Sequence, residues 1–178
     1  IRSDFKIINK KDIKKYININ VDKFTLFIFG GSQGSKPINE HILNNIDYYN
    51  NLNANIIWQC GIKHYPSISK ISLNSNIKIF DFIKNMNQIY SASDLIVSRS
   101  GALTLSEINF FGKASILIPL PSAAGNHQYK NALFSKNSNA SIIIKQNRLI
   151  HGELEKNIEK LIKNPNMINN MEVAAKSL

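Results

Sequence analysis

The chain has 178 residues, of which 43% are hydrophobic, and it carries a formal net charge of +10 with a pI of about 9.7. This length and composition favour one globular domain with its own core, and no apolar run is long enough to span a bilayer. The lysines are dispersed and do not alternate with aromatic residues, which favours a solvated face over a nucleic-acid site; attraction to an anionic membrane stays compatible with the charge.

The N-terminal segment, residues 1–22, is polar and basic and predicts at most a short helical turn before the first strand. The chain starts at Ile1 with neither an initiator methionine nor a signal peptide, which predicts a piece of a longer protein. The single cysteine, Cys60, lies in an apolar run and has no partner for an internal disulfide. It predicts a buried thiol in a reducing compartment.

A glycine-rich loop follows the first predicted strand, the continuous apolar run 24–29. The loop reads Gly30-Gly-Ser-Gln-Gly34, and Pro37 then opens a helix. The glycines let a ligand approach the main chain, and Ser32 offers a hydroxyl and an amide to a phosphate. The loop is neither a Walker A motif nor G-x-G-x-x-G, so a tight turn without a ligand remains the alternative.

Two more strands are predicted over residues 54–60 and 77–80, with a short helix or loop between them. The segment Asp81-Phe-Ile-Lys-Asn-Met86 then leads into a helix through Tyr90. This segment can present Ile83 to a flat ring, with its amide and carbonyl free for the edge of a base. The alternative is that Ile83 belongs to the core.

The stretch 94–107 joins an apolar strand, 95–97, to a polar turn and to a helix that begins near Ala102. The first amides of a helix lack internal partners and the helix dipole is positive there, so a phosphate or pyrophosphate is the expected guest. Glu107, one turn further in, is placed to accept hydrogen bonds from ribose hydroxyls. The alternative is a capping box, in which Glu107 bonds back to the Thr104 amide and touches no ligand.

The rest of the chain continues the alternation of helices and strands. Gly112 is predicted to cap the preceding helix, and Asn126 is a candidate N-cap for a helix that starts at His127. Gln128 can reach sugar hydroxyls from that helix end. His127 beside it is either a second such contact or a solvated histidine. The remaining predicted elements are strands 114–118 and 140–144, an amphipathic helix over 153–163 and a last helix from 166 onward.

This alternation predicts an α/β domain over residues 1–178, with a Rossmann-like, doubly wound parallel sheet. Ligands bind such sheets at the carboxyl ends of the strands. Ser32, Ile83, the 100–107 turn and Gln128 all follow predicted strand ends, so we expect them to form one site.

Five segments together resemble the C-terminal, donor-binding half of the MurG family of peptidoglycan glycosyltransferases. They follow the family's order and spacing over nearly the whole chain, and even Ile1-Arg2 resembles the segment that enters that domain. The resemblance implies that the chain is the C-terminal domain of a two-domain GT-B fold. The segments are Gly30-Gly-Ser-Gln-Gly34, Asp81-Phe-Ile-Lys-Asn-Met86, Ser98-Arg-Ser-Gly-Ala-Leu-Thr-Leu-Ser-Glu107, Ile118-Pro-Leu-Pro121 and Asn126-His-Gln-Tyr-Lys-Asn-Ala132.

The resemblance implies a hexosyltransferase of cell-wall synthesis, which serves cell shape and division. It would move N-acetylglucosamine (GlcNAc) from UDP-GlcNAc to the 4-hydroxyl of the N-acetylmuramoyl sugar of lipid I, giving lipid II with inversion at the anomeric carbon. It implies no cofactor, no bound metal, no nucleic-acid partner, and peripheral attachment to anionic lipid on the cytoplasmic face of the bacterial plasma membrane. The acceptor site and catalytic base would lie in an N-terminal half, so no catalytic residue is assigned here and the fragment alone is expected to be inactive.

The family pattern also implies which residues contact UDP-GlcNAc. Ile83, through its backbone, and Arg2 would hold the uracil, and Ser32 the pyrophosphate. Glu107 would hold the ribose, and Gln128 the GlcNAc hydroxyls. The helix start would contact phosphate and sugar through Ala102, Leu103 and Thr104, with Leu105 and Ser106 beside them; Gly31, His127 and Asn131 are further candidates.

Departures from the family pattern are few. Ser35, Ala114 and His127 stand where alanine, proline and glutamine are common, which leaves a sugar contact at position 127 open. Another GT-B enzyme, such as a UDP-GlcNAc 2-epimerase, is one alternative, because a fold alone does not determine function. A basic nucleic-acid-binding domain is the other, and it predicts steeply salt-dependent binding to any duplex.

Overall fold

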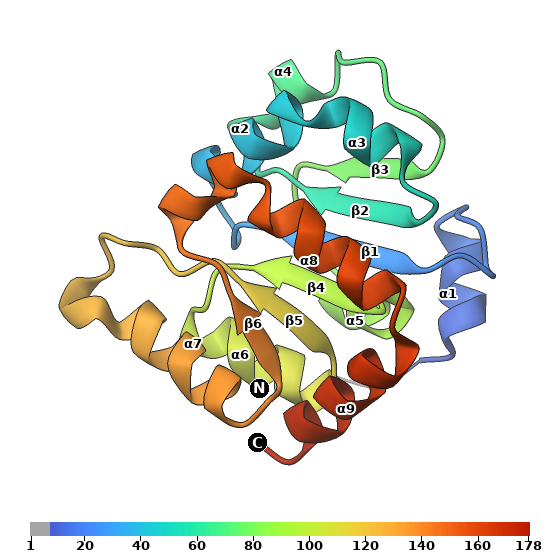
Figure 1. Cartoon of the computed structure of the whole chain (residues 1–178). Coiled ribbons are helices and arrows are strands. Elements are labelled where there is room, and N and C mark those ends of the chain that lie inside the picture. Colours follow the sequence, from blue (N-terminus) through green and yellow to red (C-terminus); the bar gives the residue numbers. More distant parts are fainter. Residues whose placement is uncertain (1–7) are drawn as a thin grey trace. The chain divides into compact units, whose positions relative to one another are not determined.

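The computed structural model describes residues 8–178, and this part of the chain divides into two compact units (Figure 1). We call the described residues up to Asp94 the N-terminal unit and residues Leu95–Leu178 the C-terminal unit. Each contains parallel strands alternating with helices, so the predicted α/β class is confirmed. That the chain is one domain stays a prediction.

The N-terminal unit is built on three parallel strands in the order β3-β2-β1. Every residue of β1 and β2 is buried, as expected for parallel strands covered on both faces. The strands are β1 (Thr25–Phe29), β2 (Asn55–Gln59) and β3 (Ile77–Phe80), and the helices are α1 (Lys10–Tyr16), α2 (Lys36–Asn44), α3 (Ile46–Asn51), α4 (Tyr65–Ile68) and α5 (Met86–Ala92).

Aromatic packing and one polar bridge hold the helices of this unit to its strands. Phe27 and Phe29 of β1 stack with centroids 4.5 Å apart, and both meet the ring of Tyr90 on α5 edge-on. On β2, the indole of Trp58 donates to Asn39 Oδ1 of α2 at 3.1 Å. Both contacts bury large aromatic area against a helix, which is the main stabilising term in such a core.

The C-terminal unit also contains three parallel strands, in the order β4-β5-β6. Helix α7 packs on β6, and α9 packs on β5 and α6. The strands are β4 (Leu95–Ser98), β5 (Ala114–Leu117) and β6 (Ser141–Ile143), the helices are α6 (Ala102–Phe111), α7 (His127–Asn137), α8 (Glu153–Ile162) and α9 (Pro165–Lys176), and short 3₁₀ turns cover Ala124–Asn126 and Gln146–His151.

The predicted strands match the observed ones to within one residue at either end, but three helix details differ. Where the sequence predicts at most a short helical turn, the structure has the seven-residue helix α1, whose N-terminus is capped by the Asn9 side chain. The apolar pattern after Pro37 predicts one helix, whereas the structure breaks it at Asn45, whose side chain donates to the His41 carbonyl at 2.8 Å and ends α2. Asn126 does precede α7, but in a left-handed conformation and without a side-chain capping bond. Gly112 ends α6 with φ 55°, as predicted.

Cys60 directly follows β2 and is fully buried, which confirms the predicted buried thiol. Burial raises the pKa of this thiol to about 11, because a thiolate there would lose its hydration.

In the described part of the chain, no helix is both long and apolar enough to cross a membrane.

Candidate functional site

The N-terminus of α6 presents open backbone amides. Gly101 is the N-cap, without a side-chain capping bond, and the amide of Leu105 makes the first bond of the helix, to the Gly101 carbonyl at 3.0 Å. Among residues 8–178 nothing accepts a hydrogen bond from the amides of Ala102, Leu103 or Thr104. The first turn also carries no acidic side chain that would repel an anion. This helix end therefore suits a phosphate.

Ser100 connects the start of α6 to the start of α7. Its side chain is fully buried, and its hydroxyl donates to the Gln128 carbonyl at 2.8 Å. Asn131, one turn further along α7, donates from Nδ2 to the Ser100 carbonyl at 3.2 Å. The structure thus brings the predicted residues Gln128 and Asn131 next to the open end of α6. The positive ends of two helix dipoles lie close together there.

Gln128 and His127 each have one side-chain atom that is hydrogen-bonded within the protein. Gln128 Oε1 accepts the amide of Leu120 at 3.0 Å, and the described residues provide no acceptor for its Nε2 group. His127 Nδ1 lies 2.7 Å from the Ala124 carbonyl, so this nitrogen carries the proton and donates. Gln128 is therefore oriented to donate to a sugar hydroxyl, while His127 can offer its Nε2.

Glu107 is buried on α6, with about 5% of its surface exposed. The helix begins at Ala102, which makes Thr104 its third residue and not its N-cap. The capping-box alternative is therefore wrong, because its geometry requires a threonine before the first helical residue. The predicted bonds from Glu107 to ribose hydroxyls stay a prediction.

Leu105 and Ser106 have their groups engaged within α6. The Leu105 amide bonds to Gly101, and its side chain is buried. The Ser106 hydroxyl donates to the Ala102 carbonyl at 3.1 Å. The Leu105 amide is therefore occupied. The Ser106 side chain is exposed and its hydroxyl oxygen can still accept a hydrogen bond, so its predicted contact with the ligand stays a prediction.

The glycine-rich loop between β1 and α2 combines one crowded glycine with one open glycine. A Cβ on Gly34 would lie 2.0 Å from the Cys60 carbonyl oxygen, whereas a Cβ on Gly31 would meet no atom within 4 Å. Both have positive φ, 75° and 91° respectively. Ser32 between them is exposed, and its hydroxyl has no partner among the described residues. The loop is packed at one end and leaves main chain accessible at the other.

Gln59, at the end of β2, links this loop to the segment after β3. Its Oε1 accepts the Ile83 amide at 2.9 Å, and its Nε2 donates to the Gly31 carbonyl at 3.0 Å. The expectation that the Ile83 amide is free for a base is therefore wrong, because Gln59 already occupies it. Only the carbonyl remains as a predicted base contact. The sequence signal for Gln59 was a polar residue at the end of an apolar run.

Two further predictions on the site concern Arg2 and metals. Arg2 lies outside the described residues, so its predicted contact with uracil stays untested. Within residues 8–178, no three His, Cys, Asp or Glu side chains gather closely enough to hold a metal ion. That the reaction needs neither metal nor cofactor stays a prediction.

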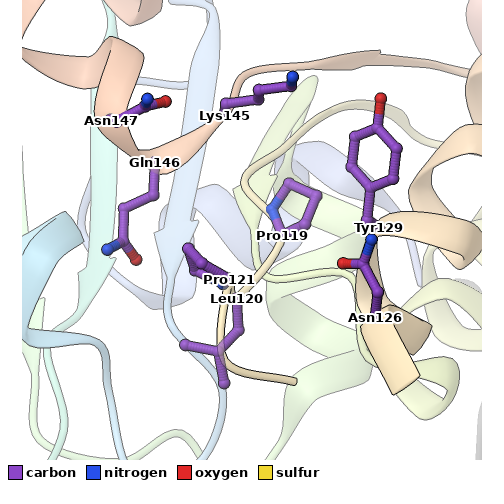
Figure 2. Close-up of a pocket in the computed structure, with 8 residues that line it drawn as sticks. All are labelled: Pro119, Leu120, Pro121, Asn126, Tyr129, Lys145, Gln146 and Asn147. Atoms are coloured by element: carbon purple, nitrogen blue, oxygen red, sulfur yellow. The ribbon is translucent and has the colours of Figure 1, made fainter. Parts of the chain in front are cut away.

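A cavity in the C-terminal unit, which we call the lateral cavity, was not predicted. It measures about 490 Å³ and opens between the loop after β5, the start of α7 and the loop after β6 (Figure 2). Figure 2 shows Asn126 and Tyr129 of the α7 side facing Gln146 and Asn147 across it. Its lining is Pro119, Leu120, Pro121, Asn126, Tyr129, Lys145, Gln146 and Asn147.

Arg99 supports the lateral cavity from the protein interior. Its Nη1 donates to the carbonyls of Ile118 and Pro119, and its Nη2 donates to Gln146 Oε1 at 2.7 Å. Burial lowers the pKa of this guanidinium to about 10, so it stays positively charged near neutral pH. The signal for Arg99 in the sequence was a charged residue directly after a buried strand.

Comparison with known families and proteins identifies relatives over most of the chain. The family model for the glycosyltransferase family 28 C-terminal domain matches residues 25–178. A protein from Bacillus cytotoxicus, named UDP-N-acetylglucosamine–N-acetylmuramyl-(pentapeptide) pyrophosphoryl-undecaprenol N-acetylglucosamine transferase, is 36% identical over 93% of this chain and 46% of its own length. A Rickettsia felis protein of the same name is 41% identical over 82% of this chain and 42% of its own length.

Solved structures agree with the sequence relatives. The crystal structure of Acinetobacter baumannii MurG matches 97% of this chain and 49% of its own, with a TM-score of 0.76 and 29% identity. The glycosyltransferase VinC, in complex with dTDP, matches with a TM-score of 0.69 over 97% of this chain and 39% of its own. At 14% identity, this second likeness concerns the fold alone. The chain spans about half the length of the relatives it matches.

Proposed function

Because the chain belongs to the glycosyltransferase family 28 C-terminal domain family, we propose that it is the donor-binding half of a hexosyltransferase that uses UDP-GlcNAc. The observation that carries the proposal is the open N-terminus of α6, held beside Gln128 by Ser100. Amides for a phosphate and a side-chain donor for a sugar are thereby adjacent. The names of the relatives support GlcNAc as the sugar.

The C-terminal unit supplies three of the proposed donor contacts. The amides of Ala102, Leu103 and Thr104 take the diphosphate, since they lack acceptors and lie at the positive end of the helix. Glu107 accepts hydrogen bonds from the ribose hydroxyls. Gln128 donates from Nε2 to a GlcNAc hydroxyl, because its Oε1 already accepts the Leu120 amide.

The N-terminal unit contributes the contacts that the resemblance implies there. Ser32 is exposed next to the open Gly31, which suits a phosphate contact through hydroxyl and amide. The Ile83 carbonyl, with its own amide held by Gln59, accepts from the uracil ring.

The proposed transfer uses these contacts and has the inverting course that the resemblance implies. An acceptor hydroxyl oxygen attacks the anomeric carbon of GlcNAc from the face opposite the diphosphate, which inverts that centre. The bond from the carbon to the β-phosphate oxygen breaks, and UDP leaves with the electron pair. The α6 amides meet the new negative charge without reorganising. The proton of the acceptor goes to a base that we place outside this chain.

We place the acceptor site in an N-terminal half joined to this chain. The relatives' name identifies an N-acetylmuramyl-(pentapeptide) pyrophosphoryl-undecaprenol acceptor, and the same acceptor, lipid I, is proposed here with its 4-hydroxyl as the nucleophile. An undecaprenyl tail resides in a bilayer, so the enzyme would work peripherally at the cytoplasmic face of the plasma membrane. No cofactor, metal or nucleic acid is required in this scheme.

Calorimetric titration of the full-length protein with UDP-GlcNAc, UDP-glucose and UDP tests the proposal. UDP-GlcNAc should bind more tightly than UDP-glucose. Glu107→Gln should weaken all three ligands by roughly 10- to 100-fold, because it removes hydrogen bonds to a charged group worth about 1.5–3 kcal/mol. Glu159→Gln, which changes an exposed carboxylate on α8, is the matched control and should bind as the wild type does.

Two outcomes would contradict this assignment. Equal affinity for all three ligands would leave a nucleotide site but remove the assigned sugar. Unchanged affinity in Glu107→Gln, with thermal unfolding showing a folded protein, would remove Glu107 from the ribose site.

A further inference from the structure

The lateral cavity has a lining that suits a peptide more than a nucleotide. Three side-chain amides, from Asn126, Gln146 and Asn147, line it and together offer hydrogen-bond donors and acceptors that can pair with peptide groups. Pro119, Leu120 and Pro121 provide apolar surface for small side chains. The volume, about 490 Å³, lies in the range of ligand sites, and the lining contains no acidic residue.

Positive charge lies both at the rim and beneath the floor of the cavity. Lys145 Nζ is 5.9 Å from the centre of the Tyr129 ring, and in the described part of the chain no carboxylate pairs with it. Arg99, buried below, donates to Pro119 and Gln146, which both line the cavity. The Arg99 bond also turns the Gln146 amide so that its Nε2 remains as a donor. An anionic group is therefore favoured in the cavity.

The cavity directly adjoins the proposed GlcNAc contact. The Leu120 amide that orients Gln128 belongs to a residue of the cavity lining. Asn126 and Tyr129, two and one residues from Gln128, line the cavity as well. A second substrate that approaches GlcNAc from the side of the cavity could place its reacting group at GlcNAc and a different group in the cavity.

We propose that the lateral cavity binds the peptide arm of the acceptor, with a peptide carboxylate held by Lys145. The identity of the acceptor rests on the proposed function. Muramyl is an acyl group, so a pentapeptide joined to it through its amino end keeps a free carboxylate at the other end. The side-chain amides of the cavity pair with the peptide groups of the acceptor. The apolar surface of Pro119, Leu120 and Pro121 contacts the side chains of that peptide.

Binding of N-acetylmuramyl-pentapeptide to the full-length protein tests the proposal directly. The probe is prepared as the C-terminal acid and as the C-terminal amide, both without pyrophosphate or lipid, so that only the peptide carboxylate differs. The wild type should bind the acid roughly 3- to 10-fold more tightly than the amide, as expected for an ion pair at a partly open site. Lys145→Gln should bind both forms equally, at the affinity of the amide.

Lys136→Gln is the matched control, because Lys136 is an exposed lysine on α7 outside the cavity. It should keep the preference for the acid. Three results would each overturn the proposal. They are equal binding of acid and amide by the wild type, no binding at millimolar probe, and loss of the preference for the acid in Lys136→Gln as well as in Lys145→Gln. An acceptor captured through its pyrophosphate instead would appear as one of these results, since the probe lacks that group.

Titration of the same variants with UDP-GlcNAc separates this proposal from the proposed function. Lys145→Gln should leave UDP-GlcNAc affinity unchanged and, in a transfer assay, raise KM for the acceptor alone. A loss confined to UDP-GlcNAc would assign the cavity to the donor and overturn the inference. If the wild type failed to bind UDP-GlcNAc but kept its preference for the peptide acid, the proposed function would fail and the peptide site would stand.

Discussion

Gly31 and Gly34 both have positive φ, yet a side chain would meet very different surroundings at the two positions. At Gly34 it would collide with the backbone at Cys60 and Gly61, whereas at Gly31 it would point into open space. The side-chain amide of Gln59 makes two different bonds. Its Nε2 donates to the Gly31 carbonyl, and its Oε1 accepts from the Ile83 amide. Single residues therefore decide which parts of the loop are packed and which are open to a ligand.

Gly34→Ala should destabilise the protein more than Gly31→Ala does. Both substitutions place a Cβ at positive φ, which costs about 1–2 kcal/mol. Only Gly34→Ala adds a clash with backbone atoms, which have no rotamer through which to relax. Urea unfolding of the two variants measures the difference in the free energy of unfolding. Equal losses of stability would show that the loop relaxes around the new Cβ at position 34 without a further loss of stability.

Helices α6 and α7 act together because Ser100 joins their first turns. The Ser100 hydroxyl and carbonyl each bond to a residue of α7, and α6 starts two residues after Ser100. The phosphate amides and the sugar donor therefore depend on one buried serine. On the other side of α7, Tyr129 faces the lateral cavity, so the same helix contributes to both proposed substrate sites.

Ser100→Ala should lower both stability and donor affinity. It removes the hydrogen bond from Ser100 to the Gln128 carbonyl, and a typical hydrogen bond contributes about 0.5–1.5 kcal/mol. Ser138→Ala is the control, because that exposed hydroxyl bonds only to a carbonyl of its own helix, Phe134. It should change stability by less than about 0.5 kcal/mol. Chemical denaturation and UDP-GlcNAc titration of both variants provide the measurement, and equal effects would exclude a special role for Ser100.

The net charge and the similarity to longer proteins are properties of the whole chain. The charge of +10 is spread over lysines in both units, so it acts as a diffuse field and not as a shaped site. A diffuse positive field suits attraction to an anionic lipid surface, which the proposed lipid-linked acceptor would require. Relatives about twice as long support an enzyme in which this chain supplies one of two halves.

Sedimentation with lipid vesicles tests the charge at this scale. The full-length protein should bind vesicles that contain anionic lipid in low salt and dissociate near 1 M salt, where the Debye length falls to about 3 Å. Neutral vesicles are the control and should bind weakly. Equal binding to neutral vesicles, or binding that salt does not affect, would show that the net charge is not the cause.

The order of strands and helices could be predicted because each leaves a local pattern in the sequence. Continuous apolar runs indicated the buried strands, and the polar turn before Ala102 indicated the open helix end. Gly112 as a C-cap followed from the same local logic. The resemblance to a glycosyltransferase family, supported by the family match, also came from ordered segments of sequence.

Other features depended on contacts between residues far apart in the chain. Gln59 captures the Ile83 amide across 24 residues, and Arg99 orients Gln146 across 47. Such pairs have no periodicity, so neither the occupied amide nor the lateral cavity could be inferred from the sequence. By itself the sequence determined the elements and the family, because local propensity and burial pattern specify them. Tertiary structure alone decided which polar groups remain open to ligands, because that depends on which partners the fold brings within hydrogen-bond distance.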